Sequence, residues 1–134
     1  MNKILYRVWD KKCNVMRPVV RLEGDPGTGE MYGVLVGAKN EHLKEVVLMQ
    51  YIGLNDKNGK EIYEGDVLAL DNERFKVRWS QQLAAFMVEP LTSEARQRGE
   101  LKYVNDLFAF TEKTTEFEVV GNIYENADLD RRMK

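Results

Sequence analysis

The sequence predicts a mainly β protein, a small and partly open β-barrel with added hairpins and one or two short helices. Short runs rich in β-branched and aromatic residues recur about every eight to twelve residues, separated by Gly, Asn and Asp, a spacing typical of small barrels and sandwiches. Of the 134 residues, 43% are apolar and 31% charged, so one domain can bury a core without disulfides. We expect that domain at residues 1–126, with a charged, frayed tail at 127–134.

The N-terminal part is expected to form hairpins. Residues 4–9 alternate between two faces, as a strand does, and a polar turn follows at 10–14. Pro18 interrupts the next apolar run, 15–22. Because proline cannot donate to a sheet ladder, this run is expected to be an edge strand. Residues 24–30 contain three glycines and a proline, and we expect them to form a hairpin tip.

The centre and the C-terminal part carry the clearest strand and turn signals. Asn58-Gly59 is the strongest short hairpin signal, because both residues accept positive φ. Along 74–79 apolar and basic residues alternate, the pattern of a half-buried strand. In a final strand, 117–124, Gly121 is expected to mark a bulge or a close backbone approach. The residues expected to fill the barrel interior are Tyr63, Val67, Phe75 and Trp79.

Two regions, 38–47 and 104–110, fit either helix or strand, and a short helix is expected between them. Asn40 can cap a short helix through Val46, although residues 38–47 end in β-formers. A second short helix is expected to end at Gly99. Residues 104–110 are apolar and fit either structure, because a short apolar run has no decisive period.

Composition excludes several classes of function. The 20 basic and 22 acidic residues give a net charge of −2, so no global charge attracts nucleic acid or anionic membranes. A single cysteine and a single histidine exclude an internal disulfide and a Cys/His zinc site. No signal peptide and no apolar run of membrane-spanning length occurs. We therefore expect a cytoplasmic protein of a bacterial cell, with no membrane partner.

Motifs for catalysis and cofactor binding are incomplete. Gly24 and Gly29 have the separation of a phosphate-binding loop, but Glu30-Met31 follows where Lys and Ser or Thr are needed. A calcium loop around residues 56–59 lacks carboxylates at its first and last positions. We expect a non-enzymatic protein with no catalytic, cofactor-binding or metal-binding residues. A carboxylate-based enzyme is a disfavoured alternative, because no pair of acids stands out.

Basic side chains gather with aromatic ones near the N-terminus, and a basic row follows one later strand. Aromatic rings that stack on bases, beside cations that meet phosphates, bind single-stranded nucleic acid. The same pattern fits strands whose rings enter the core and whose charges face solvent. The candidate nucleic-acid contacts are Tyr6, Arg7, Trp9, Lys11, Lys12, Arg74, Lys76 and Arg78.

Two stretches combine Gly, Asn and aromatic residues in a specific order: LMQYIGLNDKNGKEIYEGDV at 48–67 and FEVVGNIYEN at 117–126. With the opening YRVWD at 6–10, they resemble the YopX family of small phage and prophage proteins. The turn at Gly65 between two strands is also similar to that of an SH3-like barrel, by fold analogy alone. The family resemblance implies a mainly β fold with a barrel-like core, and it supplies no catalytic residues.

These observations together predict a phage or prophage accessory protein of unknown function that binds a macromolecule. A host or phage protein is the favoured partner, and nucleic acid bound at the candidate contacts is the alternative. Self-association is also open, because the edge strands of a small barrel need cover.

Overall fold

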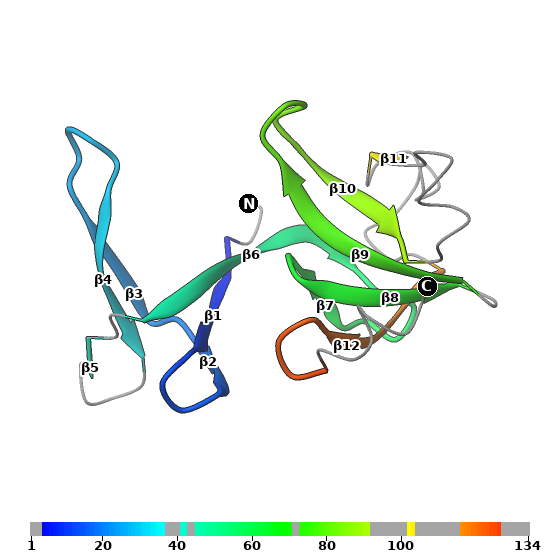
Figure 1. Ribbon diagram of the computed structural model, residues 1–134, viewed down its shortest axis with the longest axis horizontal. Helices are drawn as coiled ribbons and strands as arrows, with labels where there is room; N and C mark the ends of the chain where they lie inside the picture. The colour runs from blue at the N-terminus through cyan, green and yellow to red at the C-terminus, as the bar shows by residue number, and fades with distance from the viewer. Residues whose placement is uncertain are drawn as a thin grey trace. The chain divides into compact units, whose positions relative to one another are not determined.

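The computed structural model describes residues 4–36, 41–42, 45–70, 73–91, 102–103 and 116–126. None of these residues lies in a helix and their strand pairs are antiparallel, so the mainly β prediction is confirmed. The described residues fall into two compact units, 4–50 and 51–126, and the division comes within one strand, β6 (Val46–Asn55). Figure 1 labels the strands of both units.

Unit 4–50 contains two small groups of strands. β1 (Tyr6–Asp10) pairs with β2 (Val15–Pro18) on one side and with the first half of β6 on the other. β3 (Arg21–Gly24), β4 (Met31–Val36) and β5 (Glu41–His42) form a second sheet in that order. Val8 is fully buried, and the partly buried side chains packed against it are Val19, Leu22, Val46 and Leu48.

Most predictions for this unit are confirmed. Pro18 ends β2, which lies at the edge of its sheet, and residues 25–30 connect β3 to β4 as a hairpin. The helix through Val46 is wrong where it can be compared, because β5 occupies Glu41–His42 and Val46 begins β6. Pairing of β6 with β1 outweighs the local capping signal. Residues 37–40 and 43–44 lie outside the described part.

Unit 51–126 is built on a five-stranded sheet that curls into a half-barrel (Figure 1). Its strand order is β11-β10-β9-β8-β12, and the end of β6 pairs with β7. The strands are β7 (Glu61–Tyr63), β8 (Asp66–Leu70), β9 (Glu73–Ser80), β10 (Ala85–Pro90), β11 (Lys102–Tyr103) and β12 (Glu118–Asn122).

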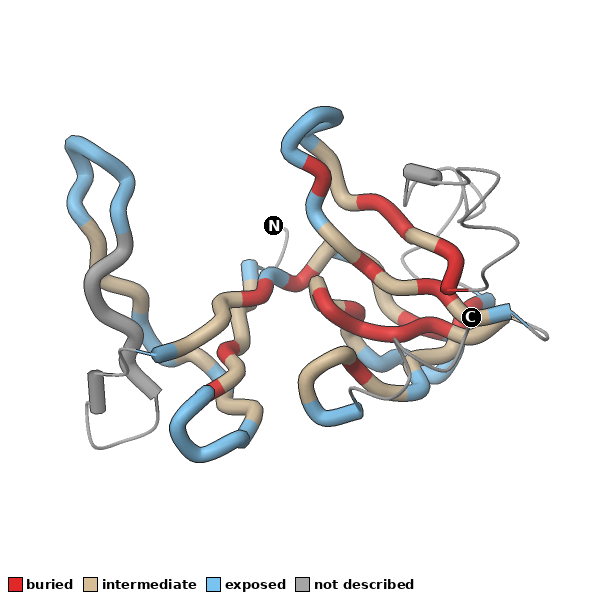
Figure 2. The backbone as a smooth tube through the Cα atoms, in the orientation of Figure 1, coloured by how far each residue is buried: buried red, intermediate tan, exposed pale blue. Residues whose placement is uncertain are grey.

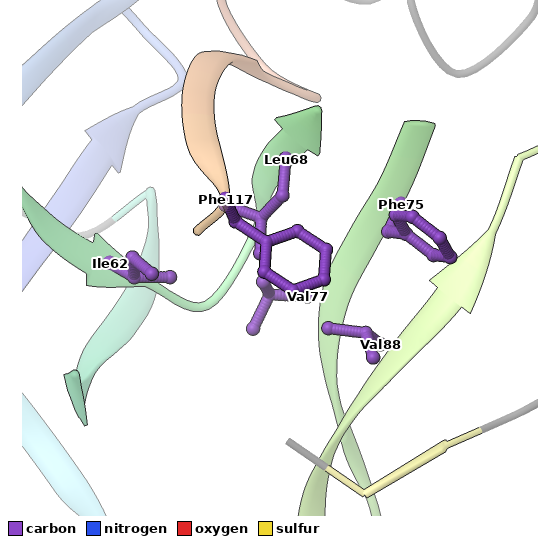
Figure 3. Close-up of a cluster of buried hydrophobic side chains, with 6 residues drawn as sticks. All are labelled: Ile62, Leu68, Phe75, Val77, Val88 and Phe117. Atoms are coloured by element: carbon purple, nitrogen blue, oxygen red, sulfur yellow. The ribbon is translucent and has the colours of Figure 1, made fainter. Parts of the chain in front are cut away.

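One face of this sheet carries the main hydrophobic core. Phe75 and Phe117 meet edge to face, with ring centroids 5.6 Å apart. Figure 3 shows the cluster, and Figure 2 shows the buried stretches on the strands that supply it. Its members are Ile62, Leu68, Phe75, Val77, Val88 and Phe117.

The predicted interior is partly wrong. Phe75 is in the core, but its partner across the sheet is Leu68, so Val67 is buried on the opposite face. Trp79 lies 44% exposed, and Tyr63 is only half-buried. Side chains of a strand change face at every residue, so an error of one position in register exchanges core and outer residues.

The bulge predicted near Gly121 is confirmed. Val119 pairs with Leu68 and Gly121 with Val67, so Val120 is an extra residue in β12. An extra residue bends a strand and interrupts its ladder. The helix that ends at Gly99, the segment 104–110 and the tail 127–134 all lie outside the described residues.

Candidate interaction surface

The hairpin formed by β9 and β10 extends beyond β8. β8 pairs with β9 only from Glu73 to Lys76, whereas β10 pairs with β9 as far as Ser80. The buried Ser80 Oγ accepts a hydrogen bond from Leu83 N–H at 3.3 Å, and Ala84 completes the turn at φ 49°. The end of this hairpin is therefore a two-stranded ribbon with an exposed tip (Figure 2).

Trp79 lies on that ribbon, opposite Phe86 on β10. Their rings meet edge to face, 5.0 Å between centroids and 73° between planes, and Phe86 in turn packs against the core. Trp79 is 44% exposed and Leu83, in the turn, is 45% exposed. The contact with Phe86 holds the indole in place while much of its surface stays in solvent. The hairpin therefore presents a fixed aromatic surface.

Sequence reasoning placed Trp79 on the correct face but in the interior. β8 begins at Asp66 and its pairing stops at Lys76, so it brings no side chain alongside Trp79. The sequence held a signal for this, because the apolar run at 67–70 is shorter than the alternating run at 74–79. The end of the longer strand then has no neighbour to cover it.

Asp56 is a buried acid with a structural task. Its Oδ1 accepts hydrogen bonds from Asn58 N–H at 2.9 Å and Lys60 N–H at 2.8 Å, within the turn between β6 and β7. Its Oδ2 accepts one from Val119 N–H, on β12, at 3.0 Å. Burial raises the pKa of Asp56, but these bonds outweigh burial and hold the pKa below its ordinary value of 3.8. The ionised Asp56 carboxylate therefore links the turn between β6 and β7 to β12.

Other buried polar side chains also close turns. Asp10 Oδ1 accepts from Lys12 N–H at 3.0 Å, and its Oδ2 accepts from Arg17 Nε at 3.1 Å. Asp66 Oδ2 accepts from Tyr63 N–H at 2.8 Å, between β7 and β8. Burial raises the pKa of Asp10, but hydrogen bonds from the backbone and from Arg17 lower it by more. The pKa of Asp10 is therefore below its ordinary value. Buried polar groups that bond to the backbone stabilise local geometry.

Asn122 also closes a turn through hydrogen bonds from the backbone, in the segment that follows β12. Its Oδ1 accepts from Tyr124 N–H at 3.0 Å and Glu125 N–H at 2.8 Å, and its Nδ2 donates to Glu125 Oε1 at 2.8 Å. Ile123 N–H donates to Gly65 O at 3.0 Å, so this turn is joined to the one between β7 and β8. The two stretches that carry the family resemblance thus contact each other here, as they do at Asp56.

The N-terminal basic group belongs to unit 4–50. Lys11 and Lys12 are exposed in the turn after β1, whereas Arg7 and Trp9 are half-buried on one face of β1. Tyr6 is half-buried on the other face, because the faces alternate. Of the five candidate contacts near the N-terminus, only Lys11 and Lys12 are exposed. The five side chains do not all lie on one face of β1.

The second basic group belongs to unit 51–126. Arg74, Lys76 and Arg78 share one face of β9, opposite the core. Glu89 on β10 lies between two of them: its Oε2 is 3.8 Å from Lys76 Nζ and 3.4 Å from Arg78 Nε. This carboxylate offsets part of the positive charge of the row. The two basic groups therefore stand on separate compact units.

Among the described residues, no group of three or more His, Cys, Asp or Glu side chains is arranged to hold a metal ion. No helix long and apolar enough to cross a membrane is found in the same part of the chain.

The fold and this surface define a small, antiparallel β protein whose half-barrel unit projects an aromatic hairpin. The chain belongs to the YopX protein family, whose model matches residues 5–129. The crystal structure of protein EF1440 from Enterococcus faecalis has the same fold, with a TM-score of 0.51 and 22% sequence identity. The similarity covers 96% of this chain and 99% of that one. No curated protein is significantly similar to the chain.

Proposed function

We propose that this protein is a non-enzymatic binding module that recognises another protein through Trp79, Phe86 and Leu83, hereafter the Trp79 surface. The single observation that carries the proposal is the 44% exposure of Trp79 on a projecting ribbon. Tryptophan is enriched among the residues that dominate the energy of protein interfaces. An indole already held by Phe86 loses little conformational freedom on binding.

The buried acids support a binding role more than a catalytic one. Asp10, Asp56 and Asp66 each accept hydrogen bonds from backbone N–H groups. Such bonds keep a carboxylate ionised and occupied, which suits a fixed turn better than proton transfer. Together with membership of the YopX family, this favours an accessory protein of a phage or prophage, acting in the cytoplasm of a bacterial host cell.

A tagged pull-down from bacterial lysate, with and without nuclease, tests the proposal. The wild-type chain, Trp79→Ala and Val120→Ala are compared, because Val120 is another exposed apolar residue, 39% exposed on β12. We expect a protein that survives nuclease, is lost with Trp79→Ala and is kept with Val120→Ala. Capture that Trp79→Ala leaves unchanged would contradict the proposal.

Nucleic-acid binding is the second candidate, favoured by the exposed Lys11 and Lys12 beside the half-buried Trp9. Phosphate contacts make affinity fall steeply with salt. Titration with single-stranded DNA should then show weaker binding on Lys11→Ala/Lys12→Ala and in higher salt. Binding that responds to neither would exclude this candidate.

A further inference from the structure

Backbone geometry along β9 identifies a second feature of the Trp79 surface. In an antiparallel strand, the N–H and C=O groups of successive residues point to opposite sides. Arg74 O accepts from Leu91 N–H at 2.9 Å, at the end of β10, so Arg74 faces β10. Val77 O accepts from Gly65 N–H at 2.9 Å, on the side of β8. Trp79, two residues further, therefore directs its N–H and C=O to the side of β8.

Among the described residues, no strand pairs with β9 at Trp79 on that side. The pairing of β8 with β9 ends with Val67 opposite Lys76. One position further along β9, the Val77 C=O accepts the hydrogen bond from Gly65 N–H. Within the described ranges, no strand pairs with β9 past this point on the β8 side. One backbone donor and one backbone acceptor thus lie at the sheet edge, next to the exposed indole.

At three other edge strands, β2, β7 and β12, a backbone N–H group is missing or already bound. Pro18 has no N–H to offer at the end of β2. On β7 the Tyr63 N–H is bound by Asp66 Oδ2 at 2.8 Å. On β12 the Val119 N–H is bound by Asp56 Oδ2 at 3.0 Å, and Phe117 O, just before this strand, accepts from Lys57 N–H at 2.8 Å. Proteins commonly block edges in this way to prevent unwanted pairing, so an unblocked edge beside an aromatic surface is notable.

The side chains around the open edge are apolar on one face. Trp79 and Phe86 share the face of Val77 and Val88, whereas Arg78 and Glu89 belong to the opposite face. A strand that added alongside β9 would place alternate side chains on these two faces. Its side chain next to the indole should therefore be apolar and uncharged.

We propose that an extended segment of the partner protein adds as a strand to β9 at Trp79. Its backbone bonds to the Trp79 N–H and C=O, and one of its apolar side chains covers the Trp79–Phe86 pair. This is β-augmentation, in which backbone bonds give affinity and alternate side chains give specificity. The inference rests on the proposed function and adds to it the form and the chemistry of the partner segment.

The test uses the full chain and a displayed library of random linear peptides. Peptides selected on the wild-type chain are synthesised both unmodified and with backbone N-methyl groups at successive positions. We expect enrichment of alternating apolar sequences, whose binding is lost with Trp79→Ala and kept with Val120→Ala. N-methylation at one position should weaken binding about tenfold, because one backbone hydrogen bond is lost.

Amide hydrogen exchange gives a direct readout of the same bond. In the free chain the Trp79 amide should exchange much faster than the Arg78 amide, which faces β10. The selected peptide should protect the Trp79 amide and leave that of Val120 unchanged. A Trp79 amide already protected in the free chain would overturn the inference.

The outcomes separate this inference from the proposed function. Peptides that need Trp79 but tolerate N-methylation everywhere, with no new protection, would overturn strand addition and leave the binding role intact. Failure to select any peptide, or selection of peptides that ignore Trp79→Ala, would also overturn strand addition. Protection of the Trp79 amide by self-association or by single-stranded DNA instead would assign the edge to another occupant and overturn the inference. The binding role itself is judged by the pull-down.

Discussion

The Asp56 carboxylate accepts a hydrogen bond from the Val119 backbone at 3.0 Å, across 63 positions of the sequence. The same side chain closes the turn between β6 and β7 through Asn58 and Lys60. One acid therefore sets a local turn and covers the outer edge of β12. Both residues lie in stretches that carry the family resemblance, and this hydrogen bond joins the two stretches.

Replacement of Asp56 by alanine should destabilise the chain strongly. It leaves the buried N–H groups of Asn58, Lys60 and Val119 without an acceptor, and we expect a loss of about 3 kcal/mol in the free energy of unfolding. Urea denaturation of the wild type and of Asp56→Ala measures this difference in the free energy of unfolding. The control is Glu118→Ala, which removes an exposed ion pair with Lys57 (3.7 Å) and should cost less than about 1 kcal/mol. Equal losses would contradict the role assigned to Asp56.

The stability of the chain should also depend on Asp56 in acid. The pKa of Asp56 is lowered in the folded state, so its contribution is complete above the ordinary value of 3.8 and is lost as pH falls through the folded pKa. Asp56→Asn removes this titration. Below about pH 4 we expect the wild type to lose stability more steeply than Asp56→Asn in thermal unfolding. Parallel pH profiles would show that Asp56 does not contribute.

Phe75 and Trp79 provide a matched pair of aromatic residues on the same face of one strand. Phe75→Ala removes a core ring, 7% exposed, and should cost about 3–5 kcal/mol. Trp79→Ala removes an exposed ring held by one aromatic contact and should cost about 1 kcal/mol. Chemical denaturation of Phe75→Ala and Trp79→Ala compares their losses in the free energy of unfolding. Similar costs would place Trp79 in the core after all.

Gly59 is expected to be needed for its backbone conformation alone. Its φ is +83°, and a Cβ there would meet nothing within 4 Å, so Gly59→Ala should cost about 1 kcal/mol through strain. Gly27→Ala is the comparison: a Cβ there would lie 3.2 Å from Asp25 Oδ1, in an exposed turn. We expect a smaller change in melting temperature for Gly27→Ala. A larger one would contradict the assignment of strain to Gly59.

Much of the fold followed from local patterns. Alternation along 74–79, the turn at Asn58-Gly59 and the edge position of Pro18 were all predicted correctly, because each depends on backbone preferences of a few neighbouring residues. The candidate interaction surface was harder to predict from the sequence. The basic residues were selected by charge and aromatic content, and their ion pairs with Glu89 depend on a neighbouring strand whose register the sequence does not show.

By itself the sequence determined the β character of the chain and the positions of its main turns. Glycine and asparagine accept positive φ, proline lacks an N–H, and β-branched residues favour strands wherever they lie. Only the tertiary structure decided that Asp56 meets Val119, that Leu68 rather than Val67 faces Phe75, and that Trp79 is exposed. These relationships depend on the register and relative length of paired strands, which contacts between distant residues determine.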